Sequence, residues 1–484
     1  MTKPLADAPN MEQIKKQAKD LLKGHQAQDA DAIGRIHQFH PQLSKLLQSD
    51  ILAGGFTLAD AQLTVAREYG FASWPRLKKH VDSLTLAGRL KAAISADDVS
   101  LVTQMVQRNP ELLRAPVGYG GAGPLTWAAE CRQAPPSAER LEIARFLIEA
   151  GADIHEGGDA PLMRAALRDD RIPMMELLVA HGADINAQWN GFYSIILASC
   201  EALAPRALRW LLDRGADPNA ISRGQPDYGT ALDMAIATYD RSPRQSECVN
   251  ALIEAGGTSK YSHLPSVLIH RRRVDLLIEA LDADPGLAHR QFPALDYGAT
   301  GLTDLSLRGT TLMHVAAEYG EVDALRALLE RGADVNARAA TDDRGVGGQT
   351  PLFHAATQFR DFGLEAVRFL IATGADLTVR ARVPSGYDKP GETLDVTALG
   401  YAARFPHGEW ECHGTTRLLA DSGAPAGDVY AAAKLGMTEE LRQLLESGAD
   451  PNTAHPHGET ALAAATRNGH APAVSLLRDA GALG

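Results

Sequence analysis

Three side chains in the middle of this chain have the types that acid–base catalysis uses. His354 could act as a base or an acid near neutral pH, Tyr401 could transfer a second proton, and Glu318 could orient the histidine or act as an acid. Three arginines could clamp an anionic group, since a guanidinium fork pairs with carboxylates and phosphates: Arg380, Arg382 and Arg404. No P-loop, dinucleotide fingerprint, G-x-S-x-G or H-E-x-x-H is present, so such an enzyme would need no cofactor and would carry out elimination, isomerisation or hydrolysis.

The elements that would position these residues are predicted from one stretch, Gly309 to Ala339. After a turn signal, it predicts a short helix from Thr311 to Tyr319, a break at Gly320, and a second helix from Glu321 to Arg331. The second helix ends before Gly332, the usual residue for a left-handed C-cap. A helix pair this short cannot bury its apolar face alone, so it needs copies of itself as neighbours.

Copies of this unit recur along the chain. The ending of the second helix recurs, in part eroded, at Gly151, Gly182, Gly215, Gly256, Gly332, Gly374, Gly423, Gly448 and Gly481. The helix start recurs as GPLTWAAE at 123, APLMRAAL at 160, TALDMAIA at 230, TPLFHAAT at 350, TALGYAAR at 397 and TALAAATR at 460. These motifs resemble the ankyrin repeat, which has a period of about 33 residues and a T-P-L-H-x-A start. The resemblance implies an all-α fold, an ankyrin-repeat α-solenoid of about eleven helix-turn-helix units.

The chain divides by pattern into residues 1–85, a predicted N-terminal helical cap with diverged repeat-like helices, and residues 86–484, the repeat array. Residues 57–81 resemble a segment that commonly precedes ankyrin arrays in bacterial proteins. Phe71 and Trp74 in this segment would shield the first repeat, as a terminal unit must; the alternative is an aromatic patch that docks a partner.

Composition narrows the class of partner and the compartment. The chain has no hydrophobic run of about 18 residues and no leader at Met1, and its four cysteines are scattered, which together predict a cytoplasmic protein that does not contact a membrane. The net charge is -12, and the array after residue 90 has 36 basic and 51 acidic side chains. This excess argues against nucleic acid and favours a protein partner with a basic surface, or a small ligand held by local charges.

Three successive connections in the middle of the array are enlarged. Gly332 to Thr350 spans 18 residues and Gly374 to Thr397 spans 23, against 12 from Gly448 to Thr460, and the connection before Thr311 is also long. In an ankyrin array such connections are hairpin fingers, and insertions on one face often mark the binding face. The alternative is neutral drift in loop length. Finger residues that could bind a ligand are Asp296, Tyr297, Arg380, Arg382, Tyr387 and Asp388.

The first helices supply a second set of candidates. The residue before each Ala-Ala pair, and those after it, should face the concave surface of the array. These positions include Trp127, Arg164, Glu318, His354, Tyr401 and Arg404. His314 differs, because it occupies the His position of the T-P-L-H start and is expected to hold neighbouring turns together by hydrogen bonds.

A separate cluster has side chains that could bind a metal: His407, Glu409, Glu411, Cys412 and His413. Its spacing matches no defined zinc pattern, so no metal site is predicted.

Two hypotheses of different classes follow. In the first, the chain is a non-catalytic interaction protein whose concave surface and fingers hold a protein partner, with aromatic and arginine anchors such as Trp127, Tyr387, Tyr401 and Arg404. In the second, the fingers close a small-molecule pocket, and His354, Tyr401 and Glu318 are catalytic. A monomer is favoured over a homodimer.

Overall fold

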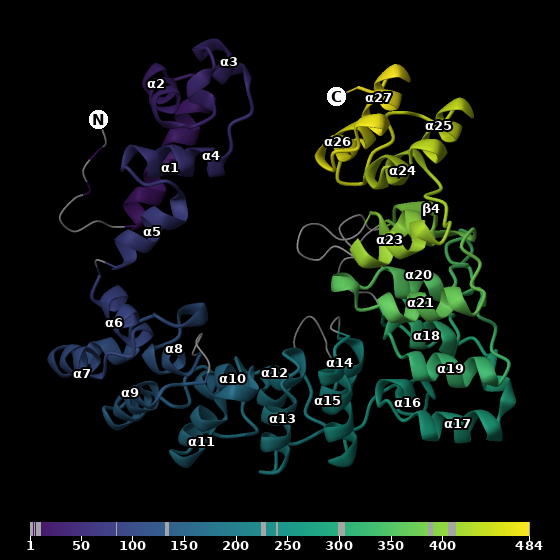
Figure 1. Cartoon of the computed structure of the whole chain (residues 1–484). Coiled ribbons are helices and arrows are strands. Elements are labelled where there is room, and N and C mark those ends of the chain that lie inside the picture. The colour runs from purple at the N-terminus through teal and green to yellow at the C-terminus, as the bar shows by residue number, and fades with distance from the viewer. Residues whose placement is uncertain are drawn as a thin grey trace. The chain divides into compact units, whose positions relative to one another are not determined.

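The chain forms two compact units in the computed structural model shown in Figure 1. One unit comprises residues 1–166 and 170–191, and the other residues 167–169 and 192–484. The structure describes residues 3, 5, 11–83, 85–130, 135–223, 229–238, 241–298, 305–385, 391–404 and 413–483. Among these residues, no helix has both the length and the apolar composition that crossing a bilayer requires. The boundary expected at residue 85 stays a prediction.

The first 83 residues form short helices around a core of their own. The core residues include Leu21, Ile36 and Val65, and the partly buried Phe71 and Trp74 pack against this same cluster. These two aromatic side chains therefore have a packing role within the N-terminal helices. The elements are α1 (Met11–Gln26), α2 (Ala30–Phe39), η1 (Leu43–Lys45), α3 (Gln48–Ala53), α4 (Leu58–Glu68) and α5 (Trp74–Ser83).

Helix pairs follow from residue 86 onward, as the repeated motifs predict. The pairs up to residue 191, with the short elements between them, are α6 (Leu86–Ser95), α7 (Val99–Arg108), η2 (Pro110–Arg114), η3 (Tyr119–Gly121), α8 (Pro124–Glu130), α9 (Ala138–Glu149), α10 (Ala160–Ala166), η4 (Asp169–Arg171), α11 (Ile172–Ala180) and the strand β1 (Gln188–Trp189).

The second unit continues the pattern to the end of the chain. Its elements are β2 (Tyr193–Ser194), α12 (Ile195–Glu201), α13 (Pro205–Leu212), α14 (Ala231–Ala237), α15 (Pro243–Glu254), α16 (Ser266–His270), α17 (Val274–Ala283), η5 (Pro285–Ala288), α18 (Leu312–Glu318), α19 (Val322–Glu330), α20 (Pro351–Ala356), η6 (Phe359–Asp361), α21 (Leu364–Ala372), β3 (Arg380–Pro384), β4 (Thr393–Thr397), α22 (Ala398–Ala402), α23 (His413–Asp421), α24 (Val429–Leu435), α25 (Thr438–Glu446), α26 (Ala461–Arg467) and α27 (Ala471–Asp479). The described residues thus contain eleven helix pairs, α6–α7 to α26–α27, and the predicted all-α repeat fold is confirmed.

The boundaries of one pair show why the sequence folds this way. Thr311 caps α18 through a reciprocal contact with His314, whose Nδ1 lies 2.9 Å from the Thr311 hydroxyl. Gly320, with φ of 66°, ends the first helix, and Gly332, with φ of 85°, ends the second. A left-handed residue has little steric cost only when it lacks a Cβ, so these two glycines place the turns of the unit.

Neighbouring pairs stack through their first and second helices separately. In the second unit α18 lies against α20 and α20 against α22, while α17 lies against α19 and α19 against α21 (Figure 1). The alanine pairs permit this approach because they add little volume; Ala316 and Ala317, for example, are fully buried. The His314 Nε2 atom lies 3.1 Å from the Gln349 carbonyl of the next repeat, which confirms its structural role.

The enlarged connections are joined by backbone pairing between their described residues. We call them the first finger (residues 289–310), second finger (339–350) and third finger (380–397). In the third, β3 pairs antiparallel with β4, with Arg382 opposite Asp395. Bridges join Phe292 to Thr310 within the first finger, Thr341 to Gly347 within the second, and Gly347 to Arg382 between the second and third. Adjacent fingers therefore support one another through backbone pairing.

Candidate functional site

His354 and Glu318 do lie together, as the acid–base hypothesis requires. His354 Nδ1 is 2.9 Å from Glu318 Oε2, and the other carboxylate oxygen of Glu318 accepts a 2.7 Å hydrogen bond from Arg241. The exposed fractions of the three side chains are 0% for His354, 2% for Glu318 and 1% for Arg241. His354 and Glu318, which were expected to face the concave surface of the array, are therefore buried instead. They form a buried network, which we call the Arg241–Glu318–His354 triad.

The electrostatics of the triad favour a charged carboxylate. Burial by itself would raise the pKa of Glu318, but attraction from the Arg241 guanidinium and the contact with His354 outweigh it, so the pKa lies below its usual range. Arg241 also donates to the carbonyls of Thr238 and Gly298 and stacks over the Tyr319 ring, 4.3 Å from its centroid. The ion pair thus has the additional partners that a desolvated charge needs.

The first finger supplies a second buried group beside the triad. The Tyr297 hydroxyl lies 2.9 Å from His270 Nε2, and the His270 ring meets the Tyr319 ring edge-on with centroids 4.3 Å apart. Burial lowers the pKa of His270 to about 3 and raises that of Tyr319 to about 12, so both are neutral over the physiological range. Asp296, in contrast, is about one-third exposed and pairs with Lys260 at 3.0 Å.

Tyr401 is also buried, contrary to expectation. Its side chain is fully inaccessible, and its hydroxyl donates a 3.0 Å hydrogen bond to the Pro384 carbonyl in the third finger. The finger therefore covers Tyr401 instead of opening a pocket above it.

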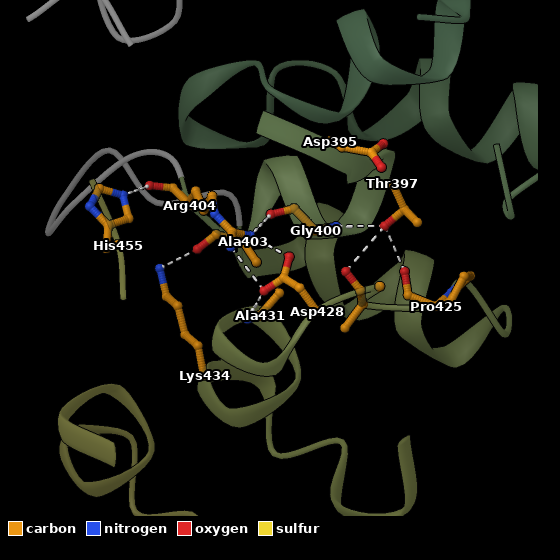
Figure 2. Close-up of polar contacts among 12 residues, drawn as sticks. Asp395, Thr397, Gly400, Ala403, Arg404, Pro425, Asp428, Ala431, Lys434 and His455 are labelled. Carbon is orange, nitrogen blue, oxygen red and sulfur yellow. Dashed lines mark hydrogen bonds and ion pairs between the residues drawn. The ribbon is translucent and has the colours of Figure 1, made fainter. Parts of the chain in front are cut away.

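Arg404 belongs to another buried contact, drawn in Figure 2. Its guanidinium makes two hydrogen bonds to Asp428, of 2.8 and 2.9 Å, while Asp428 also accepts from the Ala431 amide and so caps α24. Lys434 donates to the Ala403 carbonyl and His455 Nε2 contacts the Arg404 carbonyl, at 2.7 and 2.8 Å (Figure 2). Because Arg404 is only 3% exposed, it cannot form an anion clamp with the finger arginines in this arrangement.

Arg380 and Arg382 are exposed on β3, as a binding role would require. Arg380 donates to the carbonyls of Asp395 and Gly427, and Arg382 donates to the Thr393 hydroxyl at 3.0 Å. Their guanidinium groups are thus held in place mainly by neutral oxygens. Two further predicted ligand-binding residues of this finger, Tyr387 and Asp388, lie outside the described residues.

The remaining two candidates lie on neighbouring first helices of the other unit. Trp127 on α8 donates its indole N–H to the Ser95 hydroxyl of α6 at 3.0 Å, and Arg164 on α10 pairs with Glu130 of α8 at 3.0 Å. Both keep part of their surface exposed. Trp127 and Arg164 are therefore placed where a partner could reach them.

Two pockets lie in the described part of the second unit, and the residues proposed for acid–base chemistry line neither of them. A pocket of about 510 Å³ is lined by residues that include Ala403, Arg417 and Lys434, and one of about 640 Å³ by residues that include Leu268 and Arg271. His354, Glu318 and Tyr401 line neither of them.

Metal binding finds no support in the part of the chain that the structure describes, where no three His, Cys, Asp or Glu side chains are grouped as a metal site. Residues 407–412 of the predicted cluster lie outside that part.

Sequence reasoning missed Arg241, Asp428 and Tyr119, whose ring centroid lies 4.6 Å from the Arg164 guanidinium. Arg241 lies 77 residues from Glu318 along the chain, so no local spacing links them. Asp428 had an available signal, since an Asp three residues before a helical alanine is a common N-cap. Tyr119 lies in the turn before a start motif and showed no pattern.

Comparison with known families agrees with this arrangement of helix pairs. A family model described as ankyrin repeats in three copies matches residues 130–222 and 274–381, and one described as ankyrin repeats in many copies matches residues 429–478. The chain belongs to the ankyrin repeat family.

Ankyrin repeat proteins of known name are similar to parts of the chain. The NF-kappa-B inhibitor cactus of Drosophila melanogaster is 28% identical over 203 residues, which are 41% of this chain and 35% of cactus. Cactus of Drosophila yakuba is 26% identical over 224 residues, covering 45% and 39%. The B-cell lymphoma 3 protein homolog of Mus musculus is 38% identical over 95 residues, 19% of each protein. The aligned parts span less than half the length of these ankyrin repeat relatives.

Proposed function

We propose that this ankyrin repeat chain is a non-catalytic interaction protein that binds a protein partner through the exposed residues of its first helices and fingers. Family membership supports the proposal, since repeat arrays present extended binding surfaces. The name of cactus, NF-kappa-B inhibitor, describes an action on another protein. For this chain we propose only that its partner is another protein.

One contrast in accessibility carries the proposal. His354 and Glu318, which an enzyme would use, are at most 2% exposed and satisfied by one another and by Arg241. Trp127 and Arg164, which a protein interface would use, remain partly exposed on adjacent helices. Tryptophan and arginine are the residue types that most often dominate binding energy at interfaces.

Three finer points belong to the same proposal. The acidic excess of the array favours a basic surface on those parts of the partner that contact the acidic faces of the array. The thiols of Cys200 and Cys248 are free and buried, and burial raises their pKa, so both are unreactive and fit a reducing cytoplasm. We propose that the chain acts as a monomer.

The test is affinity capture from native cell lysate, with bound proteins and bound small molecules both identified. The baits are the wild-type chain, Trp127→Ala, Arg382→Ala, and Arg145→Ala as a control on an exposed position of a second helix. Circular dichroism checks that each variant folds.

We expect a protein captured by the wild type and by Arg145→Ala, and reduced about tenfold or more by Trp127→Ala or Arg382→Ala, because truncation of one interface anchor costs roughly 2 kcal/mol. Retention of a small molecule, with no captured protein that responds to the variants, would refute the proposal and favour the enzyme alternative.

A further inference from the structure

Charge is unevenly divided between the first and second helices of residues 86–191. The first helices α6, α8 and α10 contain three cationic side chains, Arg89, Lys91 and Arg164, and a single carboxylate, Glu130. The second helices α7, α9 and α11 contain three arginines and four carboxylates, a net charge of -1 against +2 for the first helices: Arg108, Arg140, Arg145, Glu139, Glu142, Glu149 and Glu176. In a chain of net charge -12, the first helices of this unit are therefore locally basic.

Aromatic rings hold these cations in place. The Lys91 ammonium lies over the Trp127 ring, 3.8 Å from its centroid. The Trp127 indole N–H donates to Ser95, one turn after Lys91 on the same helix, which fixes the ring against α6. Lys91 is thus presented on an aromatic surface with its position already restricted, which reduces the entropy lost on binding.

The second cation is held in the same manner one repeat further. Arg164 lies over the Tyr119 ring, 4.6 Å from its centroid, and pairs with Glu130 at 3.0 Å. The Glu130 side chain is only 8% exposed, whereas Tyr119 is 60% exposed. Because Glu130 and Trp127 are one helical turn apart on α8, the two cation–aromatic pairs are continuous with each other.

We infer that Lys91, Tyr119, Trp127 and Arg164 form a docking surface for an acidic segment of a protein partner, which we call the cation–aromatic face. The inference rests on the proposed function and names the chemistry of the partner at this unit. Carboxylates of the segment pair with the Lys91 ammonium and the Arg164 guanidinium, and its apolar side chains pack on the exposed parts of the Tyr119 and Trp127 rings.

Charge complementarity favours an acidic segment over a basic one on the cation–aromatic face. A basic segment would meet an excess of positive charge, because the three first helices keep a net charge of +2 after the nearly buried Glu130 has paired with Arg164. The acidic excess of the whole array therefore predicts the wrong partner charge for this face, since binding depends on the local potential.

The test measures fluorescence anisotropy of labelled short peptides with the full-length chain. The probes are an alternating Glu/Tyr peptide, the matching Lys/Tyr and Ser/Tyr peptides, and a single-stranded oligo-dT of equal charge. The variants are Lys91→Glu and Tyr119→Ala, and the matched control is Arg145→Glu. Arg145 is exposed on α9 of the same unit, so its reversal changes net charge equally on a different face.

We expect the Glu/Tyr peptide to bind at least about tenfold more tightly than the Lys/Tyr or Ser/Tyr peptide, and more weakly as salt rises. Lys91→Glu and Tyr119→Ala should each weaken it roughly fivefold or more, and Arg145→Glu less than about twofold. Equal effects of Lys91→Glu and Arg145→Glu would overturn the inference, as would binding of oligo-dT alone or of no peptide.

The two proposals fail differently. If the chain captures a protein through Arg382 but the Glu/Tyr peptide does not bind, the cation–aromatic face is refuted and the interaction function stands. If no protein is captured through either surface, the interaction function itself is refuted.

Discussion

The Arg241–Glu318–His354 triad makes a strong prediction about stability. Replacing Glu318 with Gln keeps the size of the side chain but removes the charge that faces Arg241 at 2.7 Å. Arg241 is 1% exposed, so its charge would stay in a desolvated site without the carboxylate that balances it. Breaking a buried pair from one side costs about 3–5 kcal/mol.

A second ion pair of the same length provides the control. Arg331 and Asp282 also lie 2.7 Å apart, but the Asp282 side chain is 61% exposed. Asp282→Asn removes the same charge from a solvated site, where water replaces the lost partner, so no measurable change is expected. The two variants differ mainly in burial, which isolates the contribution of desolvation.

Hydrogen exchange with mass spectrometry is the suitable assay, because a repeat array opens locally and a single melting temperature does not describe it. In Glu318→Gln, amides of α18 and α20 should exchange roughly two hundredfold faster or more, with those of α1–α5 unchanged. Adding Arg241→Met should restore most of the protection, since an apolar replacement leaves no unpaired charge. Equal exchange in Glu318→Gln and Asp282→Asn would show that the triad is solvated and that our reasoning is wrong.

Three further outcomes are expected. Burial lowers the pKa of His270 and of His314 to about 3 in the folded state, against an ordinary value of 6.5. Each therefore contributes stability that is present above pH 6.5 and decreases as the pH falls toward 3. From pH 7 to pH 5 the loss is about 2 kcal/mol per histidine, measurable by urea titration at each pH. Asp428→Ala should lower the free energy of unfolding by about 3 kcal/mol or more, because it removes both the partner of buried Arg404 and the N-cap of α24. The loss should be seen as faster hydrogen exchange in α22 and α24. Asp428→Asn should restore the stability that the N-cap contributes, but not that of the ion pair. Gly332→Ala should cost roughly 1 kcal/mol by urea unfolding, since φ is 85° at this position, and a neutral effect would contradict the left-handed C-cap.

Local features of the fold could be predicted from the sequence because they depend on neighbouring residues. Gly320 and Gly332 mark helix ends, and both adopt the positive φ that the repeat requires. The contacts of His314 also follow from its place in the start motif. In each case a few consecutive residues determine the backbone, and copies of the motif confirm it along the chain.

The exposure of the candidate site could not be predicted in this way. The start motif predicts that His354 and Tyr401 face the concave surface of the array, yet both are fully buried. The enlarged fingers explain this difference. The Gln349 side chain of the second finger approaches His354, and the Pro384 carbonyl of the third accepts from Tyr401. The long connections that suggested a pocket are the segments that cover these side chains.

Partners far apart in the chain are the other reason for the errors. Arg404 was assigned to an anion clamp because it follows an Ala-Ala pair near two other arginines. Its guanidinium instead binds Asp428 of the next repeat in a bidentate pair. A carboxylate 24 residues away thus neutralises the charge that the clamp would have used. Repeat periodicity predicts which helices are adjacent, but not which side chains between them pair.

The same distinction applies to charge. A net charge of -12 is a sum over all faces of the chain, whereas a partner contacts only one of them. Because successive first helices stack, Lys91 on α6 and Arg164 on α10 add their potentials on the two sides of α8, although they are 73 residues apart. The carboxylates of α9 belong to the other helix row, where Arg140 and Arg145 of the same helix partly offset their charge. In a repeat protein the charge of one helix row, read at the repeat period, is therefore a better guide to a partner than the charge of the chain.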